Sequence, residues 1–208
     1  GFQVIYCYRG WVDLVYEDQG PPFRLEAGNC VIQPPEIRHR VLFASEDLEV
    51  IEIGVPAEHI TTLDHNMELP TEHMRPDRLF AGQKFVHYKA NETEWRPFRL
   101  PGFVARDTMI CANTGAVAGV QVVKPGPGAP VWARHTSDIH FTFVLHGQLT
   151  LQSKEQAAQT LVAGDAFVIP PNMACLYSAA SEDLELLEVS LPGEFETHFE
   201  DGAQEDRA

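Results

Sequence analysis

The hydrophobic and polar positions of this chain follow the short alternating runs that are typical of β-strands. The runs are rich in β-branched and aromatic residues, and they end at turns that contain Gly, Pro or Asn. Strands are predicted at residues 2–8, 11–16, 23–25, 48–53, 85–88, 95–100, 104–111, 117–123, 141–145 and 166–169. A helical turn is expected at residues 192–199, and the polar residues 201–208 are expected to form a mobile tail. The pattern predicts an all-β protein.

An internal repeat runs through the chain. The sequence Gly-Asn-Cys-Val-Ile-Gln-Pro-Pro at residues 28–35 matches residues 164–171 at an offset of 136 (164 minus 28). The hexapeptide Ala-Ser-Glu-Asp-Leu-Glu at residues 44–49 returns unchanged at residues 180–185, without a gap. An ungapped repeat of this kind indicates two copies of one supersecondary unit. Two domains are therefore expected.

The most probable linker by composition is residues 61–82, which hold prolines and mixed charges with no sustained period. It suggests domains at residues 1–75 and 76–208. The chain opens inside a strand, so the first domain is expected to lack its upstream strands. Part of residues 85–100 is expected to pair with the first domain and cover its open edge.

Composition and charge limit the classes of binding partner that the chain is expected to have. The formal net charge is −15 over 208 residues, and no basic run interrupts it, which disfavours nucleic acid and anionic membrane surfaces. The four cysteines show no C-x-x-C spacing, and no apolar run approaches the ~18 residues of a membrane span. A cytoplasmic protein is expected, with a small-molecule ligand as partner and a homodimer as an open alternative.

The second half of the chain resembles the cupin superfamily in its spacing. The family's motifs are G-x5-H-x-H-x(3,4)-E-x6-G and G-x5-P-x-G-x2-H-x3-N. Counted back from Gly147, the family's glutamate falls on His140, its second histidine on His135 and its first on Ala133; counted forward from Gly164, its last histidine falls on Cys175. The resemblance implies an all-β fold of two cupin-type double-stranded β-helix (jelly-roll) barrels in tandem, a bicupin.

The resemblance also implies where a metal would bind. In the second domain the donors would be His135, His140 and Cys175, a set that suits Fe, Zn, Ni or Cu without deciding among them. In the first domain the motif positions hold only Gln3 and His39, an incomplete set that a His-x-His upstream would complete. The alternative is that these histidines are hydrogen-bonded barrel residues and that Cys175 is a buried thiol.

Three functions follow from the resemblance. The first is a metal-dependent dioxygenase acting on a small organic substrate, in a pocket shaped by Trp132, Thr142, Phe143 and Tyr177. The second is a non-catalytic small-molecule-binding or structural cupin with a degenerate metal site. The third is a sugar isomerase or epimerase that would use His135 with Tyr177. Fold alone does not choose among them.

Overall fold

The computed structural model describes residues 1–58 and 60–200, so the expected tail at residues 201–208 lies outside the described part. Nearly all regular structure is β, as the sequence pattern predicts. The chain forms two compact units, one made of Gly1–Glu92 with Ala112–Gly115 and the other of Thr93–Cys111 with Ala116–Ala208. The boundary expected between residues 75 and 76 therefore falls inside the first unit.

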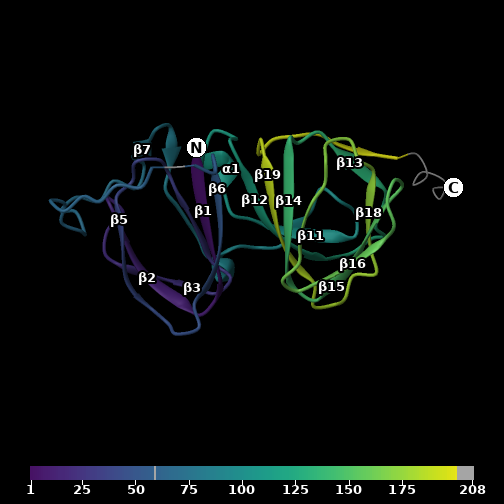
Figure 1. Ribbon diagram of the computed structural model, residues 1–208, viewed down its shortest axis with the longest axis horizontal. Coiled ribbons are helices and arrows are strands. Elements are labelled where there is room, and N and C mark those ends of the chain that lie inside the picture. The colour runs from purple at the N-terminus through teal and green to yellow at the C-terminus, as the bar shows by residue number, and fades with distance from the viewer. Residues whose placement is uncertain (59, 201–208) are drawn as a thin grey trace. The chain divides into compact units, whose positions relative to one another are not determined.

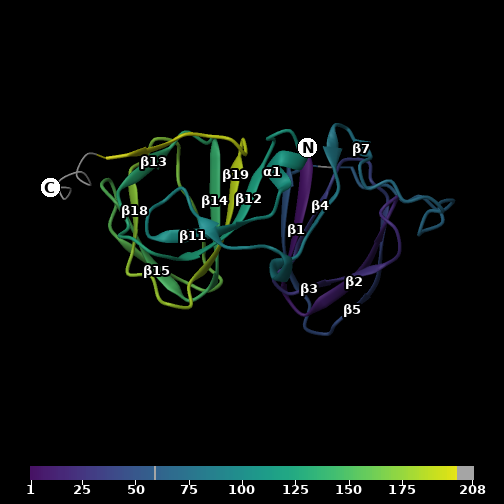
Figure 2. The ribbon, with the colours of Figure 1, turned by 180° about the vertical axis from the view of Figure 1, so that it is seen from behind.

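The first unit contains two main sheets, ordered β6-β1-β4-β9 and β3-β2-β5, and a small β7-β8 ribbon. Its elements are β1 Phe2–Arg9, β2 Trp11–Tyr16, β3 Phe23–Glu26, β4 Cys30–Gln33, β5 His39–Ala44, β6 Glu49–Val55, β7 Leu79–Phe80, β8 Gln83–Lys84, β9 Val86–Tyr88 and the 3-10 helix η1 Ala90–Glu92. Figure 2 shows β1 and β4 side by side in one sheet and β2, β3 and β5 in the other. β9 pairs with β4, with Val31 opposite His87, which confirms that residues from the 85–100 segment cover an edge of this unit.

Residues 61–82, which contain β7 at their end, belong to the first unit and do not link the two units, contrary to the sequence prediction. The end of β2 carries two buried carboxylates, Glu17 and Asp18, which require cations nearby. Arg78 supplies one, with Nη1 at 2.5 Å from Glu17 and 2.6 Å from Asp18, and Arg75 adds a second contact to Asp18. These ion pairs hold the segment to its own unit.

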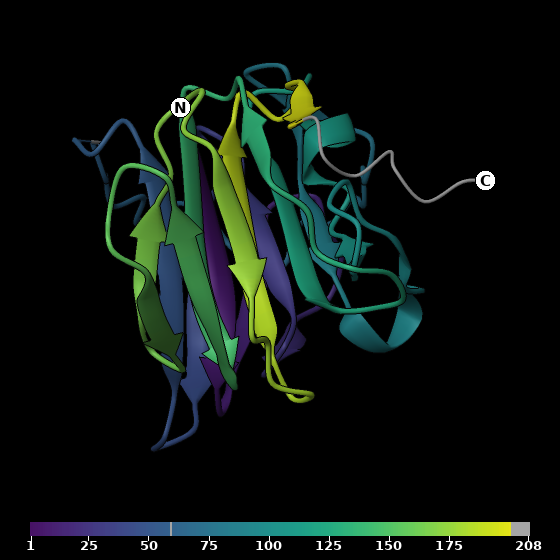
Figure 3. The same cartoon turned by 90° about the vertical axis from the view of Figure 1, so that its right-hand side faces the viewer.

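The second unit contains a six-stranded sheet, β10-β11-β12-β19-β14-β17, and a five-stranded sheet, β16-β15-β18-β13-β20. Its elements are β10 Arg96–Pro97, β11 Phe103–Asp107, the helix α1 Ile110–Asn113 shared with the first unit, β12 Gly119–Pro125, β13 Ala133–His135, β14 Ile139–His146, β15 Gln148–Ser153, β16 Gln159–Val162, β17 Ala166–Val168, β18 Cys175–Ser178, β19 Glu185–Leu191 and β20 Thr197–Phe199. The labels β12, β19 and β14 lie next to one another in Figure 1, and Figure 3 views the molecule from the side on which β13, β18 and β16 are labelled in Figure 1.

The helical turn expected at residues 192–199 is wrong, because this segment contains β20. β20 pairs antiparallel with β13, with Arg134 opposite His198, and so covers an edge of the five-stranded sheet. The backbone donors and acceptors of β13 need a partner, and this long-range requirement outweighs the local sequence preference.

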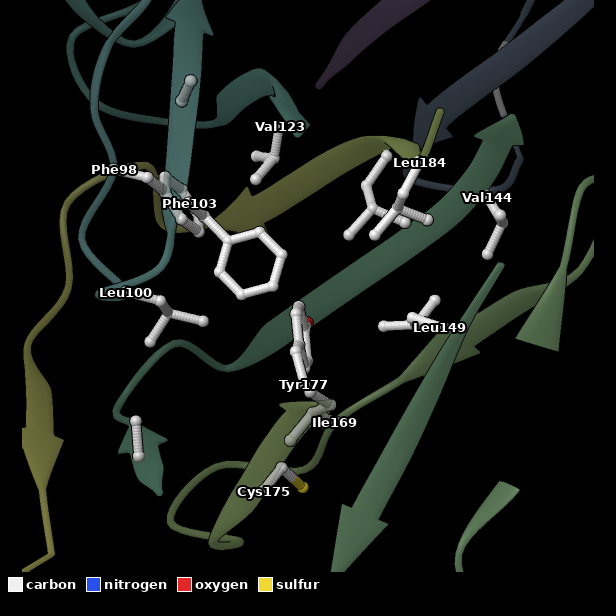
Figure 4. Packing of buried hydrophobic residues seen from close by; sticks show 13 residues of the cluster. Phe98, Leu100, Phe103, Val123, Val144, Leu149, Ile169, Cys175, Tyr177 and Leu184 are labelled. Atoms are coloured by element: carbon white, nitrogen blue, oxygen red, sulfur yellow. The ribbon is translucent and has the colours of Figure 1, made fainter. Parts of the chain in front are cut away.

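The interior of the second unit has an apolar end and a polar end. Figure 4 shows the apolar end, where the Tyr177 ring packs edge-on against Phe103 with ring centroids 5.8 Å apart. Leu149, Val144 and other members of this cluster have no exposed surface, and each fully buried side chain of this size contributes about 1.5–3 kcal/mol. The polar end lies further along β14 and β19, and the candidate site is there.

Candidate functional site

His135 and His140 lie together in the interior of the second unit. His135 is at the end of β13, and His140 is on β14, where buried residues alternate with half-buried ones as in a strand with one inner face. The two imidazole rings stack with centroids 4.5 Å apart and 28° between their planes. Both are almost completely buried. The sequence prediction that these two side chains converge inside one barrel is thus met.

A buried ion pair contacts His140. Glu188 on β19 lies opposite Thr142 of β14, so its side chain shares the inner face with His140. Arg99, in the segment between β10 and β11, places Nη2 2.7 Å from Nε2 of His140 and 2.9 Å from Oε2 of Glu188. The same Glu188 oxygen is 3.2 Å from His140 Nε2. One guanidinium nitrogen therefore sits between an imidazole and a carboxylate.

The charges in this cluster are fixed by their surroundings. Burial alone would raise the pKa of Glu188, but the positive charge of Arg99 lowers it to about 2, so the carboxylate is ionised. Burial, reinforced by the positive charge of Arg99, lowers the pKa of His135 to about 4. His135 is accordingly a neutral imidazole near pH 7.

The contacts of the two imidazoles determine which nitrogen of each ring carries the proton. Nε2 of His140 lies 2.7 Å from Arg99 Nη2, which only donates, and 3.2 Å from Glu188 Oε2, which only accepts; the shorter contact assigns the lone pair to Nε2 and the proton to Nδ1. Nε2 of His135 lies 3.1 Å from the carbonyl oxygen of Ile169, which only accepts, so this nitrogen carries the proton. Within the described residues, Nδ1 of each ring is buried and makes no hydrogen bond.

Two aromatic rings enclose the guanidinium of Arg99. Its Cζ atom lies 4.9 Å from the ring centre of Phe98 and 5.2 Å from that of Phe195. Phe195 also meets both imidazoles edge-on, at 5.9 Å from His135 and 5.8 Å from His140. Cation–π contact and the removal of water strengthen the ion pair that Arg99 makes.

Two hollows adjoin this cluster. A void of about 20 Å³, large enough for one water molecule, is lined by residues that include Ala133, His135, Cys175 and Tyr177. A larger pocket of about 610 Å³ has Arg99 and Glu188 in its wall. Its volume falls in the range of small-molecule sites. Arg99 lines both hollows.

The remaining residues predicted for the second unit divide into two groups. Thr142 and Tyr177 are buried in the interior, where Tyr177 lines the small void. Phe143 lies on the opposite face of β14, because neighbouring side chains in a strand alternate. The ring centre of Trp132 lies 5.4 Å from the Nζ atom of Lys154, and Trp132 lines neither hollow. Only Thr142 and Tyr177 are near the paired histidines.

The two predicted donors of the first unit do not form a site. Gln3 accepts a hydrogen bond from Gln33 and donates one to Glu52, at 2.9 and 2.6 Å. His39 is exposed and stacks on Tyr16, with centroids 5.4 Å apart. Both side chains thus have structural partners.

The residues present do not fit a divalent metal. A permanent positive charge already occupies the space against His140, one of the predicted ligands. Burial raises the pKa of Cys175 to about 11, so this position offers a protonated thiol and not the thiolate that metals bind. Across residues 1–58 and 60–200 no three His, Cys, Asp or Glu side chains cluster as a metal site would require.

Two wrapped sheets with an inward-facing polar end define a cupin-type jelly roll. Residues 119–190, within the second unit, match the family model described as a cupin domain. No curated protein sequence matches the chain significantly. Within the described residues, no helix has the length and apolar character that crossing a membrane would require.

Solved structures share the fold at low identity. Salicylate 1,2-dioxygenase from Pseudoaminobacter salicylatoxidans, in complex with gentisate, superposes with a TM-score of 0.69 at 13% identity, over 97% of this chain and 67% of that one. A putative glyoxylate-induced protein from Pseudomonas aeruginosa gives 0.64 at 15%, over 93% and 66%. A mutant Bacillus subtilis oxalate decarboxylase gives 0.61 at 13%, over 95% and 65%. The chain spans about two thirds of these proteins, and the likeness is one of fold.

Sequence reasoning missed Arg99, Glu188 and Phe195. Glu188 carried a usable signal, because it stands in the apolar run that forms β19, and a buried acid needs a cation nearby. Arg99 and Phe195 carried none, since each lies outside the long strands and reaches the site through tertiary contacts.

Proposed function

We propose that the second unit is a metal-independent small-molecule-binding barrel in which Arg99 takes the place of the metal ion. The observation that carries this proposal is the position of its Nη2 atom, 2.7 Å from His140 and 2.9 Å from Glu188. These are the distances of charge-assisted hydrogen bonds, and they satisfy both the imidazole lone pair and the carboxylate. A metal would have to displace the half-buried Arg99 from a carboxylate, leaving the arginine unpaired.

The pocket of about 610 Å³ supports the binding part of this proposal. Its wall combines aromatic surface from Phe98 and Phe195 with a few convergent polar groups, which is the usual composition of a ligand site. The alternative of a purely structural barrel gives no account of a hollow of this size beside a buried ion pair.

The tandem-barrel arrangement belongs to the same proposal. β4, β5 and β6 begin 136 residues before β17, β18 and β19, at residues 30, 39 and 49 against 166, 175 and 185. We infer two related barrels, of which the first has a Gln3–Glu52 hydrogen bond at the positions of His140 and Glu188. A homodimer and a cytoplasmic location remain predictions from the sequence.

A metal-dependent dioxygenase is the second candidate. Two observations favour it: His135 and His140 do converge, and the fold is shared with a salicylate 1,2-dioxygenase and with an oxalate decarboxylase whose Mn(II) centres have been described. It would require Arg99 to leave the cluster, so the two candidates differ in a measurable way.

The test is the metal content and metal affinity of the chain purified without an affinity tag. Iron, manganese, zinc, nickel and copper are measured by plasma mass spectrometry, before and after dialysis against each metal. The metal-independent barrel predicts well under one equivalent of each, with no change in His140→Ala. Near-stoichiometric metal that disappears in His140→Ala would reject it in favour of the dioxygenase.

A further inference from the structure

Arg99 keeps donor capacity that faces the larger pocket. Its Nη2 atom is engaged by His140 and Glu188, and Nε lies 3.4 Å from Glu188 Oε1. The recorded contact of Nη1 is a long one, 3.5 Å to the hydroxyl of Thr197. A guanidinium nitrogen of this type has two N–H groups, so at least one can donate to a ligand in the pocket.

Glu188 keeps acceptor capacity at the same place. Its Oε2 atom takes the close contacts, while the recorded contact of Oε1 is the long one from Arg99 Nε. A carboxylate oxygen accepts at two lone pairs, so Oε1 can still accept a hydrogen bond from a ligand. The wall of the pocket thus presents a donor and an acceptor side by side.

The net charge of the pocket wall disfavours binding of a ligand that carries a carboxylate. Two arginines line it, Arg96 and Arg99, against three acids, Asp107, Glu188 and Glu194, so the formal sum is −1 (2 minus 3). Arg99 is already neutralised by Glu188. An anionic ligand would compete with Glu188 for the half-buried Arg99 and would bring a like charge next to the buried Glu188 carboxylate.

We infer that this pocket takes an uncharged hydroxy-carbonyl compound of the sugar class, in which a carbonyl or hydroxyl oxygen accepts from Arg99 Nη1 and a neighbouring hydroxyl donates to Glu188 Oε1. The aromatic surface of Phe98 and Phe195 then packs against the C–H face of the ligand. The inference rests on the proposed metal-independent binding function and narrows it to a class of ligand.

The experiment compares matched neutral and anionic pairs by saturation-transfer NMR and calorimetry at pH 7, in the presence of EDTA. The pairs are glyceraldehyde with glycerate, lactamide with lactate, and glucose with gluconate. In each pair that binds, the neutral member is expected to bind at least tenfold more tightly than the acid. Removing the charge in Glu188→Gln is expected to cancel or reverse that preference, because Arg99 is then left uncompensated.

The control is Glu185→Gln, an equal charge change on the same strand outside the pocket wall, which is expected to keep the wild-type preference. If the acids bind wild-type protein as tightly as their neutral partners, the ligand class is wrong while metal-independent binding stands. If binding appears only when metal replaces EDTA, the proposed function fails. If no member of any pair binds at 10 mM, roughly the weakest affinity that calorimetry resolves, both fail.

Discussion

At the scale of single residues, the site depends on one half-buried cation. Arg99 neutralises Glu188 and satisfies the lone pair of His140, and it lines the larger pocket beside Glu188. Removing one partner from a buried ion pair is far more costly than forming the pair is favourable, because the remaining charge stays desolvated. The role of Arg99 is therefore measurable as stability.

Arg99→Met is expected to lower the free energy of unfolding at pH 7 by about 3–5 kcal/mol, since it leaves the Glu188 carboxylate buried without a cation. The double variant Arg99→Met with Glu188→Gln should recover most of the loss. Urea unfolding measures both. Arg9→Met, which breaks the exposed pair with Glu49, is the control and should cost less than about 1 kcal/mol.

The loss of stability caused by Arg99→Met should decrease as the pH falls. The folded pKa of Glu188 is about 2, below the ordinary ~4.3. The ion pair with Arg99 therefore stabilises the wild type fully above pH ~4.3, and this stabilisation is lost as the pH falls toward 2. The gap between wild type and Arg99→Met should therefore narrow on acidification. An equal gap at pH 7 and pH 3 would contradict the assignment of the loss to Glu188.

His135 gives a second pH-dependent prediction. Its folded pKa is about 4, below the ordinary ~6.5, so the unfolded chain binds this proton first and stability falls as pH drops from about 6.5 to 4. The imidazole resonances of His135 should titrate with a midpoint near 4. A midpoint near 6.5 would mean that this ring is solvated and not buried.

Sequence and structure agree at the residues whose position follows from strand alternation. His140 and Thr142 could be placed on one inner face from the pattern of residues 139–146. The same alternation contradicts the expectation that Phe143 shapes the pocket, because a residue between two inward-facing positions points outward. Arg99 could not be placed, since the strand predicted at residues 95–100 forms only at Arg96–Pro97 and the neighbours of Arg99 in space are 41 and 89 residues away in sequence.

At the scale of elements, the repeated hexapeptide supports a glycine turn in each unit. Gly147, at φ 69°, turns the chain from β14 into β15, and a Cβ atom there would lie 2.4 Å from the Ser181 hydroxyl and 2.7 Å from the Leu184 nitrogen. Ser181 accepts a hydrogen bond from Gln148 N. The equivalent turn at Gly10 is held by Ser45 in the same way. Ser45 and Ser181 of the repeated hexapeptide therefore have a structural role.

Gly147→Ala is expected to destabilise the chain more than Gly115→Ala. Both glycines have positive φ, at 69° and 63°, so each substitution costs about 1–2 kcal/mol of backbone strain. Gly115 has open space where a Cβ would be, whereas at Gly147 the backbone of Leu184 must move. Thermal unfolding compares the two. Equal losses would show that the hexapeptide does not pack against the turn.

Element prediction succeeded for strands and failed for the segments that connect them. Most predicted strands appear, because alternation and turn residues act locally. The segment at residues 61–82 was taken as a linker because its contacts, such as Arg78 with Glu17 and Asp18, are long-range ion pairs. β20 was missed for the same reason: its identity as a strand comes from pairing with β13.

At the scale of the whole molecule, a cupin-type fold carries a site that has an arginine where a metal is expected. The fold follows from the strand pattern and the repeat, while the chemistry follows from one residue in a connecting segment. Structures that share the fold at 13–15% identity therefore do not determine what this pocket binds.

The most direct test of the central claim is the ¹⁵N–¹H NMR spectrum of the His140 imidazole at pH 7, recorded before and after one equivalent of Zn²⁺. The account predicts a proton on Nδ1, a lone pair on Nε2 that accepts from Arg99, and no change when zinc is added. A proton on Nε2, or a stoichiometric zinc-induced shift of the His135 and His140 resonances, would contradict it.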